Sequence, residues 1–332
     1  MSTHYDEAMR HALSLALRGE GRTGANPIVG AVILNADGQP IAEGFHAGGD
    51  HAEVVAIKSL SSIPAGSTIV VTLEPCNHTG KTGPCVDAII NAGFVRVVYA
   101  VSDPNPIASG GADRLREAGI DVISGVLEVA SRFFNRAWLS VIEKKRPLFI
   151  WKIAATLDGK TAAADGTSKW ITSESSREFV SLLRRNSDAI LVGTGTVIAD
   201  NPTLIPHDGE DVKNPLRVVM GTREIPEGFN LHDDQAETLH VKSHDFDELI
   251  AQLLARGIKQ VFVESGSELG TAMVSAGLID EIMLFQAPTI LGAGRTFIGD
   301  LGITTLDQRF DLEILAHRQI GTDLFTHLKV GK

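Results

Sequence analysis

The chain has 332 residues, of which 43% are hydrophobic and only 5% aromatic, so we expect about two globular domains with largely aliphatic cores. Its 41 acidic and 30 basic residues give a net charge of −11, which argues against a protein that coats nucleic acid or an anionic membrane by bulk attraction. Two cysteines are too few for a disulfide scaffold, and the first residues lack a signal-peptide pattern, so we expect a cytoplasmic protein without a membrane-spanning segment.

The first half of the chain alternates predicted helices with predicted strands. Apolar residues on one face predict an amphipathic helix over residues 8–16, and an aliphatic run predicts a buried strand over residues 28–34. Further strands are predicted at residues 41–44, 68–73 and 95–101, and further helices at residues 51–60, 85–92 and 114–118. This alternation favours an α/β layer structure.

A polar run closed by Pro147 marks the predicted domain boundary. Apolar side chains at four-residue spacing, from Val129 to Val141, predict one helix over residues 126–141, and the proline disfavours helix just before it. We therefore expect one domain at residues 1–145 and a second at residues 146–332. The negative charge is concentrated in the second half, where residues 147–332 hold 26 acidic and 17 basic residues.

The second half also alternates, which again favours an α/β fold. Strands are predicted at residues 148–153, 189–192, 216–220, 260–263 and 281–287, and helices at residues 175–185, 246–256 and 269–276.

A group of possible metal ligands lies in the first half. His51 is followed two residues later by Glu53, and the only two cysteines of the chain, Cys76 and Cys85, each follow a proline. Zinc favours thiolate and imidazole ligands, and three protein ligands leave its fourth position open for a water of lowered pKa. Glu53 could take the proton of that water and pass it to a leaving amine, as in the zinc base deaminases. The alternative is a closed structural zinc site, for which His78 is the nearest fourth ligand.

Glycine-rich turns in the second half raise the question of a nucleotide cofactor. The turn that begins at Gly193 lacks the third glycine of the dinucleotide fingerprint, so an ordinary turn explains it better than a cofactor site does. The segment from Glu264 to Gly270 follows a predicted strand and opens a predicted helix, so its N–H groups could hold a phosphate.

Eight residues separate the two cysteines, whereas nucleic-acid deaminases usually have two. With Asn26-Pro27-Ile28-Val29-Gly30 and Val71-Thr72-Leu73-Glu74-Pro75, this spacing resembles the deaminase half of the bifunctional riboflavin-biosynthesis deaminase/reductase family, over residues 4–135. The motifs Lys152-Ile153-Ala154-Ala155-Thr156-Leu157-Asp158-Gly159-Lys160, Ser168-Lys169-Trp170-Ile171-Thr172 and Asp200-Asn201-Pro202 are similar to the reductase half, over residues 148–330.

The resemblance implies a cytidine-deaminase-like α/β/α domain followed by a dihydrofolate-reductase-like α/β domain. It implies catalytic Glu53 and a Zn²⁺ held by His51, Cys76 and Cys85. By position, it places NADPH contacts on Ala154, Trp170, Thr196, Asp200, Thr222, Gly266, Ser267, Glu268, Leu269, Gly270, Thr271 and Ala272, and substrate contacts on Ser168, Arg184, Leu204, His207 and Glu264. Without the family, Arg184 could equally be a solvated helix charge, and Trp170 a core residue.

Two positions in the reductase half depart from the family pattern. His207 stands where arginine is usual, and Gly221 replaces a common aspartate beside Thr222, so the affinity for phosphate is in question.

The resemblance further implies zinc-dependent deamination of a phosphoribosylaminopyrimidine, then NADPH-dependent reduction of its ribosyl group to ribityl. A homodimer through the reductase half is implied as well. Two other hypotheses are a nucleic-acid base editor, which would need a basic surface, and a zinc-stabilised binding protein without turnover.

Overall fold

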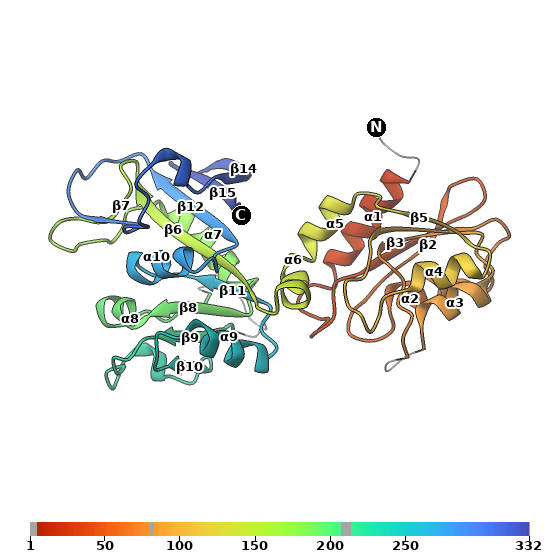
Figure 1. Cartoon of the computed structure of the whole chain (residues 1–332), viewed down its shortest axis with the longest axis horizontal. Helices are drawn as coiled ribbons and strands as arrows, with labels where there is room; N and C mark the ends of the chain where they lie inside the picture. Colours follow the sequence, from red (N-terminus) through yellow and green to blue (C-terminus); the bar gives the residue numbers. More distant parts are fainter. Residues whose placement is uncertain (1–4, 80–82, 207–213, 332) are drawn as a thin grey trace. The chain divides into compact units, whose positions relative to one another are not determined.

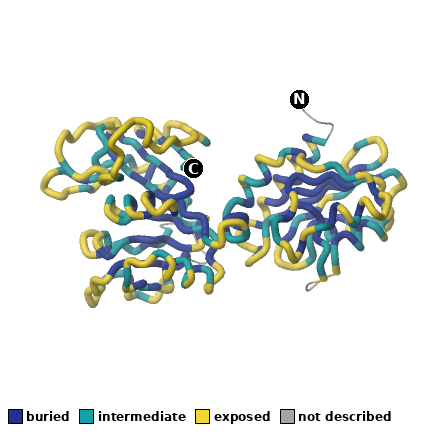
Figure 2. The backbone as a smooth tube through the Cα atoms, viewed as in Figure 1, coloured by how far each residue is buried: buried dark blue, intermediate teal, exposed yellow. Residues whose placement is uncertain are grey.

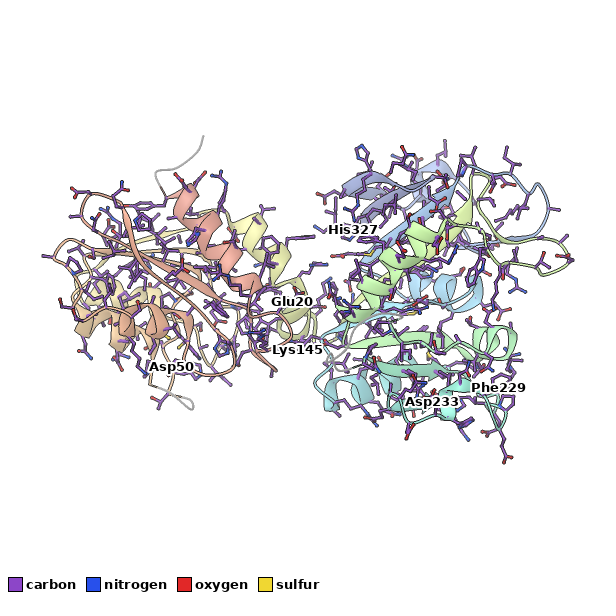
Figure 3. All side chains as sticks on the ribbon, turned by 180° about the vertical axis from the view of Figure 1, so that it is seen from behind. Glu20, Asp50, Lys145, Phe229, Asp233 and His327 are labelled. Carbon is purple, nitrogen blue, oxygen red and sulfur yellow. The ribbon has the colours of Figure 1, made fainter. Side chains whose placement is uncertain are left out.

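The computed structural model describes residues 5–79, 83–206 and 214–331, and the chain divides into two compact units, Met1–Lys145 and Arg146–Lys332. Each unit is described by itself, and Figure 3 labels Lys145, the last residue of the first. Among the described residues, no helix has both the length and the apolar character needed to cross a bilayer.

The first unit is built on a five-stranded sheet with the order β2-β1-β3-β4-β5. Its β1 pairs antiparallel with β2 and β3, whereas β3, β4 and β5 run parallel. The central strands β1 and β3 are buried along their whole length, as their aliphatic sequences predict. The strands are β1 (Gly30–Leu34), β2 (Pro40–Phe45), β3 (Thr68–Leu73), β4 (Arg96–Val101) and β5 (Asp121–Ser124).

Helices cover both faces of this sheet (Figure 1). One face carries α1 (Asp6–Leu17) and α5 (Glu128–Phe134), and the other carries α2 (Ala52–Lys58), α3 (Cys85–Ala92) and α4 (Gly111–Glu117). Figure 2 shows the buried strands between these half-exposed helices. The predicted α/β/α layers are confirmed, although the short strand β5 was not predicted.

The single helix predicted over residues 126–141 is wrong. The chain forms α5, then α6 (Arg136–Leu139) and a π-helical turn η1 (Ser140–Lys144). The break lies at Asn135, whose side chain accepts a hydrogen bond from Ile28 N (3.0 Å) and donates one to Ile28 O (2.9 Å). Val129 is 85% exposed, so the four-residue apolar spacing did not mark the buried face.

The second unit is built on an eight-stranded sheet with the order β10-β9-β8-β11-β6-β12-β15-β14. All neighbours from β10 to β12 are parallel, and only the C-terminal hairpin β14–β15 pairs antiparallel. The strands are β6 (Leu148–Thr156), β8 (Ala189–Gly193), β9 (Leu216–Met220), β10 (Thr238–Val241), β11 (Gln260–Val263), β12 (Glu281–Ala287), β14 (Leu312–Ile320) and β15 (Asp323–Val330).

The connections between the parallel strands are helical. They contain α7 (Glu174–Arg185), α8 (Thr194–Asp200), α9 (Phe246–Ala255) and α10 (Ser267–Ser275), with short turns η2 (Asn230–His232) and η3 (Leu306–Gln308). A small second sheet pairs β7 (Lys160–Ala162) with β13 (Arg295–Thr296). Strands β7, β10, β13, β14 and β15, helix α8 and the turns η2 and η3 were not predicted, whereas the other strands and helices of this unit were.

Candidate active sites

Three side chains of the first unit converge from three different segments. His51 is the N-cap of α2, Cys76 follows β3, and Cys85 is the first residue of α3. Their ligand atoms all lie within 4.8 Å of one another, with His51 Nδ1 3.2 Å from Cys85 Sγ and 3.5 Å from Cys76 Sγ. Both cysteines are free thiols, so the pair is not a disulfide. One imidazole and two sulfurs at this separation fit a tetrahedral zinc ion with one position left for water.

The charges of the cluster also fit a cation. Hydrogen bonds from Cys85 and His51 lower the pKa of the Cys76 thiol to about 4 against the opposing effect of burial. The same hydrogen bond, together with burial, raises the pKa of Cys85. A divalent ion at this position would stabilise the thiolate forms of both cysteines.

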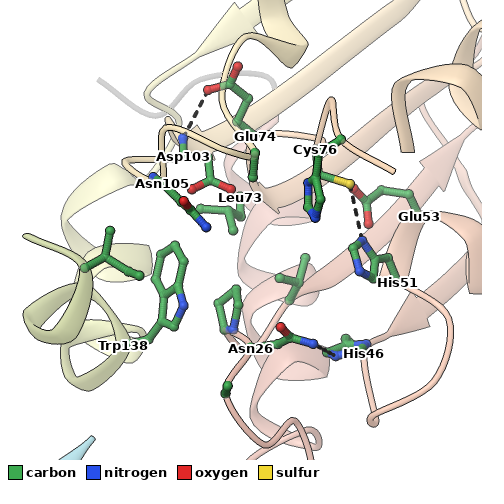
Figure 4. Close-up of a pocket in the computed structure, with 16 residues that line it drawn as sticks. Asn26, His46, His51, Glu53, Leu73, Glu74, Cys76, Asp103, Asn105 and Trp138 are labelled. Carbon is green, nitrogen blue, oxygen red and sulfur yellow. Dashed lines mark hydrogen bonds between the residues drawn. The ribbon is translucent and has the colours of Figure 1, made fainter. Parts of the chain in front are cut away.

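A cavity of about 300 Å³ opens beside the cluster (Figure 4). Glu53 lines it next to Cys76 and His51, and burial raises the pKa of its carboxyl. The volume is at the small end of the range for ligand sites and suits a single substituted ring. Glu53 does not belong to the ligand cluster among the described residues, which leaves its carboxylate available for proton transfer.

The opposite wall of the cavity is held by a buried carboxylate. Glu74 accepts hydrogen bonds from the backbone of Asp103 (3.0 Å) and Ala112 (2.9 Å), and Asp103 accepts one from Asn105 N (2.8 Å). Asp103 and Asn105 line the cavity, as Figure 4 shows. Neither was predicted as a site residue, although both follow the carboxyl end of a predicted strand, where ligands of parallel sheets usually bind.

Three further polar side chains face the cavity. His46 and Asn26 both line it, and Asn26 Nδ2 forms a hydrogen bond of 3.3 Å with His46 Nε2. His78 also lines it, and its Nδ1 is buried without a partner in the described part of the chain. Because the metal cluster there comprises three residues and not His78, the closed four-ligand alternative is not supported.

The second unit gathers its candidate residues at one edge of its parallel sheet. Ala154 lies near the end of β6, Thr222 directly follows the loop glycine after β9, and Gly266 is the N-cap of α10 after β11. Thr196, on α8 after β8, lies close to Gly266, since a Cβ built on that glycine would be 3.9 Å from Thr196 Oγ1. The carboxyl ends of parallel strands meet at such an edge, where nucleotides usually bind.

Three charged side chains meet at this edge. Arg184 donates from Nε and Nη2 to the two carboxylate oxygens of Glu264, at 2.5 and 3.0 Å, and Lys152 Nζ lies 3.9 Å from the same carboxylate. The Arg184 side chain is only 14% exposed, so the solvated-charge alternative is wrong. Burial lowers the pKa of Lys152, more than the nearby Glu264 raises it. Lys152 opens a motif of the reductase half but was not predicted as a site residue, since the resemblance assigned it no contact.

Trp170 and Leu204 differ in their exposure to solvent from what the sequence suggests. Trp170 is 69% exposed, with the Arg177 guanidinium 4.6 Å from its ring centroid, so the core alternative is wrong. Leu204, in contrast, is buried and packs among Ile190 and Val192, with φ of 54°. A ligand would therefore meet its backbone and not its side chain.

The first turn of α10 divides into two parts. Helix geometry leaves the N–H groups of Ser267, Glu268 and Leu269 without intrahelical acceptors, whereas Gly270 N already donates to Gly266 O (3.1 Å). A Cβ on Gly270 would lie 2.1 Å from the Trp151 ring. Gly270 thus allows α10 to pack closely on β6, and the free donors lie before it.

Four further predicted contacts complete the set. Asp200, at the end of α8, lies 3.6 Å from Lys169 Nζ, and Ser168 is half-buried. Thr271 Oγ1 accepts a hydrogen bond from Gly299 N (2.7 Å), and Ala272 is exposed on α10. His207 lies outside the described residues.

Comparison with known proteins gives matches in both halves. Residues 2–101 match the cytidine and deoxycytidylate deaminase zinc-binding region, and residues 147–326 match the RibD C-terminal domain. Riboflavin biosynthesis protein RibD of Mycobacterium tuberculosis is 43% identical over 97% of this chain and 96% of its own, and RibD of Escherichia coli K12 is 36% identical over 96% and 98%.

Solved structures agree with these matches. The diaminohydroxyphosphoribosylaminopyrimidine deaminase/5-amino-6-(5-phosphoribosylamino)uracil reductase of Thermotoga maritima superposes with a TM-score of 0.88 at 34% identity, over 99% of both chains. One crystal form of Acinetobacter baumannii RibD gives a TM-score of 0.87, also at 34% identity and 99% coverage of both chains. The resemblance and the fold class read from the sequence are confirmed.

Proposed function

The chain belongs to the RibD family of bifunctional riboflavin-biosynthesis deaminase/reductases, and from this membership we propose its substrates and the residues that act on them. The first unit deaminates a diaminohydroxyphosphoribosylaminopyrimidine, and the second reduces the ribosyl group of the resulting phosphoribosylaminouracil to a ribityl chain. The substrates named for the Thermotoga maritima enzyme support this choice, because the similarity covers 99% of both chains. The observation that carries the proposal is the His51–Cys76–Cys85 cluster beside a cavity lined by Glu53.

His51, Cys76 and Cys85 would hold the zinc ion of the deaminase domain. Zinc bound there supplies a Lewis acid and lowers the pKa of a bound water to about 7. The buried thiol pair contributes negative charge, and the α2 N-cap position of His51 aims its imidazole at the two sulfurs.

Glu53 moves the protons of the deamination. Its buried carboxylate carries the first proton of the attacking water to the ring nitrogen and the second, from the added hydroxyl, to the leaving amine, so that a C–N bond is exchanged for a C–O bond and ammonia leaves. The raised pKa of Glu53 suits a group that must both accept and return a proton near neutral pH.

The polar groups around the cavity orient the pyrimidine. Asn26, His78, Asp103 and Asn105 offer donors and acceptors to the ring and its ribosyl group, and the buried Nδ1 of His78 has capacity for a further hydrogen bond. A cavity of about 300 Å³ accommodates one pyrimidine ring with its substituents, which supports a small-molecule substrate over a nucleic-acid strand.

In the second unit, NADPH supplies the hydride that reduces the ribosyl carbon. We propose that the free N–H groups of Ser267, Glu268 and Leu269 bind one of its phosphates. Arg184 and Glu264 hold each other in place and position the phosphoribosyl substrate, and the half-buried Lys152 holds the proton that the opened sugar oxygen must receive. Ala154, Trp170, Thr196, Asp200 and Thr222 complete the proposed cofactor contacts, and Ser168, Leu204 and His207 the proposed substrate contacts.

We further propose a cytoplasmic homodimer formed through the second unit. The edge strand β14 exposes Leu312 and Ile314, and its partner strand exposes Leu324. Such an apolar edge is usually covered in a stable protein. Thiol ligands need a reducing compartment, which supports the cytoplasm. Light scattering of the purified chain would give a monomer mass if the dimer is wrong.

A coupled assay tests the function as a whole. The zinc-loaded chain is incubated with the diaminopyrimidine substrate, ammonia release is followed, and NADPH is then added while its absorbance is monitored. We expect one ammonia and then one NADPH oxidised per substrate. Ammonia release without NADPH oxidation would contradict the bifunctional proposal, and activity only on RNA or DNA would favour a base editor.

A further inference from the structure

One guanidinium on α4 joins the two segments that carry the thiols. Arg114 donates from Nη1 to Asn77 Oδ1 (2.9 Å) and from Nη2 to the Asp87 carboxylate. Asn77 directly follows Cys76 in the chain, and Asp87 lies two residues after Cys85 on α3. Arg114 thus spans the two segments from outside, because none of Arg114, Asn77 and Asp87 lines the cavity.

The helix that carries Arg114 is itself fixed to the first of these segments. Ala112 N donates to Glu74 Oε1 (2.9 Å), and Asn77 N donates to Ala108 O (3.0 Å). A Cβ on Gly111 would lie 1.8 Å from Pro75 O, so only glycine lets the backbones approach this closely. The start of α4 is therefore held against residues 74–77 independently of Arg114.

The segment that carries Cys85 is linked to the segment that carries Cys76 by two backbone N–H contacts. Cys85 N lies 3.5 Å from Cys76 Sγ, and Val86 N donates to Cys76 O over 3.3 Å. Both contacts are long, and both are made to Cys76 itself. The Arg114 guanidinium adds a charge-assisted hydrogen bond to Asp87. The planar fork fixes both of its acceptors at once, which a lysine would not do.

We propose that Arg114 is a positioning residue that sets the separation of the Cys76 and Cys85 sulfurs and so preorganises the metal site. The inference rests on the proposed zinc ligands. Residues around a metal site that orient its ligands typically change metal affinity by roughly ten- to a hundredfold when mutated. Because Arg114 acts through neighbours of the ligands and is partly exposed, we expect a loss of about tenfold, at the low end of that range.

The experiment measures zinc affinity directly and not only activity. The full chain is stripped of metal, and zinc is titrated against a chromogenic chelator for wild type, Arg114→Ala, Arg114→Lys and Arg116→Ala. Arg116 is the matched control, since it lies on the same helix and forms an exposed pair with Asp113 (2.8 Å). Cobalt is bound in parallel, because the position of its visible absorption bands reports the coordination geometry.

We expect Arg114→Ala and Arg114→Lys to weaken zinc binding about tenfold and to shift the cobalt bands, while Arg116→Ala binds like wild type. Equal affinity and spectra for Arg114→Ala and Arg116→Ala would overturn the inference and leave the zinc site intact. A wild-type chain that binds no stoichiometric zinc would instead overturn the proposed metal site itself. If Arg114→Ala does not fold, Asp87→Asn tests the same link, and its unchanged zinc affinity would equally contradict the inference.

Discussion

Arg184 and Glu264 form a two-point ion pair, with Nε–Oε1 and Nη2–Oε2 distances of 2.5 and 3.0 Å, although they lie 80 residues apart. Arg184 comes from the last turn of α7, and Glu264 follows the end of β11. The pair is largely buried, and the charge of Glu264 raises the pKa of Arg184 against the opposing effect of burial. Its fixed geometry at the edge of the sheet makes it the centre of the proposed reductase site.

Replacing Arg184 by lysine keeps the positive charge but removes the planar guanidinium, which donates two parallel hydrogen bonds. Since a hydrogen bond to a charged group contributes about 1.5–3 kcal/mol, we expect the reductase KM for its ribosyl substrate to rise roughly ten- to a hundredfold. The measurement is steady-state NADPH oxidation with supplied deaminated substrate. Arg256→Lys is the control, since Arg256 is the C-cap of α9 and lies in a 3.5 Å pair with Glu237. An unchanged KM in Arg184→Lys would remove this residue from the substrate site.

Glu53→Gln should abolish proton transfer without removing a proposed metal ligand. General acid–base catalysis contributes about 10²–10⁴-fold, so we expect ammonia release to fall by that factor while one equivalent of zinc remains bound. Reduction of supplied deaminated substrate by the same preparation controls for folding. Ammonia release at the wild-type rate would show that Glu53 is not the proton carrier and that another base acts in the deamination.

Cys76→Ala removes one proposed ligand. We expect loss of stoichiometric zinc and of ammonia release, because two remaining ligands hold zinc poorly. The chain divides into two compact units, so reduction of the supplied intermediate should persist. Zinc is measured by metal analysis and each reaction by its own assay. Loss of both activities would contradict the independence of the two sites.

Gly270→Ala tests the close contact between α10 and β6. The added Cβ would lie 2.1 Å from the ring of Trp151, which is only 1% exposed and cannot move away easily. Overpacking of a core costs about 1–3 kcal/mol, so the second unit should unfold at lower urea concentration. Gly266→Ala, where the nearest atom is 3.9 Å away, should change stability little. Equal midpoints for the two variants would show that the contact is not tight.

Asp323 makes the stability of the second unit depend on pH. Burial raises the pKa of its carboxyl, but hydrogen bonds from Ser176 and Ser173 outweigh this and lower the pKa below its usual value. A carboxyl with a depressed folded pKa stabilises the protein above its unfolded pKa, about 3.9, and loses that contribution as pH falls through the folded value. Asp323→Asn should therefore cost about 1–3 kcal/mol of unfolding free energy at pH 7, and less below pH 3.

The test is thermal unfolding of wild type and Asp323→Asn across that pH range. Asp311→Asn is the control, because its carboxylate is 78% exposed and pairs only with Arg309 among the described contacts. If the difference in unfolding temperature between Asp323→Asn and wild type stays constant down to the most acid pH, the effect does not come from the carboxylate charge.

Local sequence determined most of the secondary structure. Strands such as β9, β11 and β12 and helix α3 begin and end where the apolar patterns predict, because buried parallel strands need continuous aliphatic runs. The pattern failed where a long-range contact decides the outcome. Asn135 ends α5 by binding the backbone of Ile28, 107 residues away, and no spacing within the helix encodes that. The hairpin β14–β15 was not predicted because polarity does not follow burial there: β14 is mostly exposed, and two of the three buried residues of β15 are the polar Asp323 and His327.

The sequence by itself also determined the chemistry of the first site, because zinc ligands are few in kind and the chain has only two cysteines. Only the tertiary structure decided which polar residues face the cavity, that Lys152 joins Arg184 and Glu264, and that Gly270 packs on Trp151. The physical reason is the range of the interactions. Ligand type and hydrophobic periodicity are properties of a few neighbouring residues, whereas a cavity wall or a buried ion pair depends on segments that meet only when the sheet has formed.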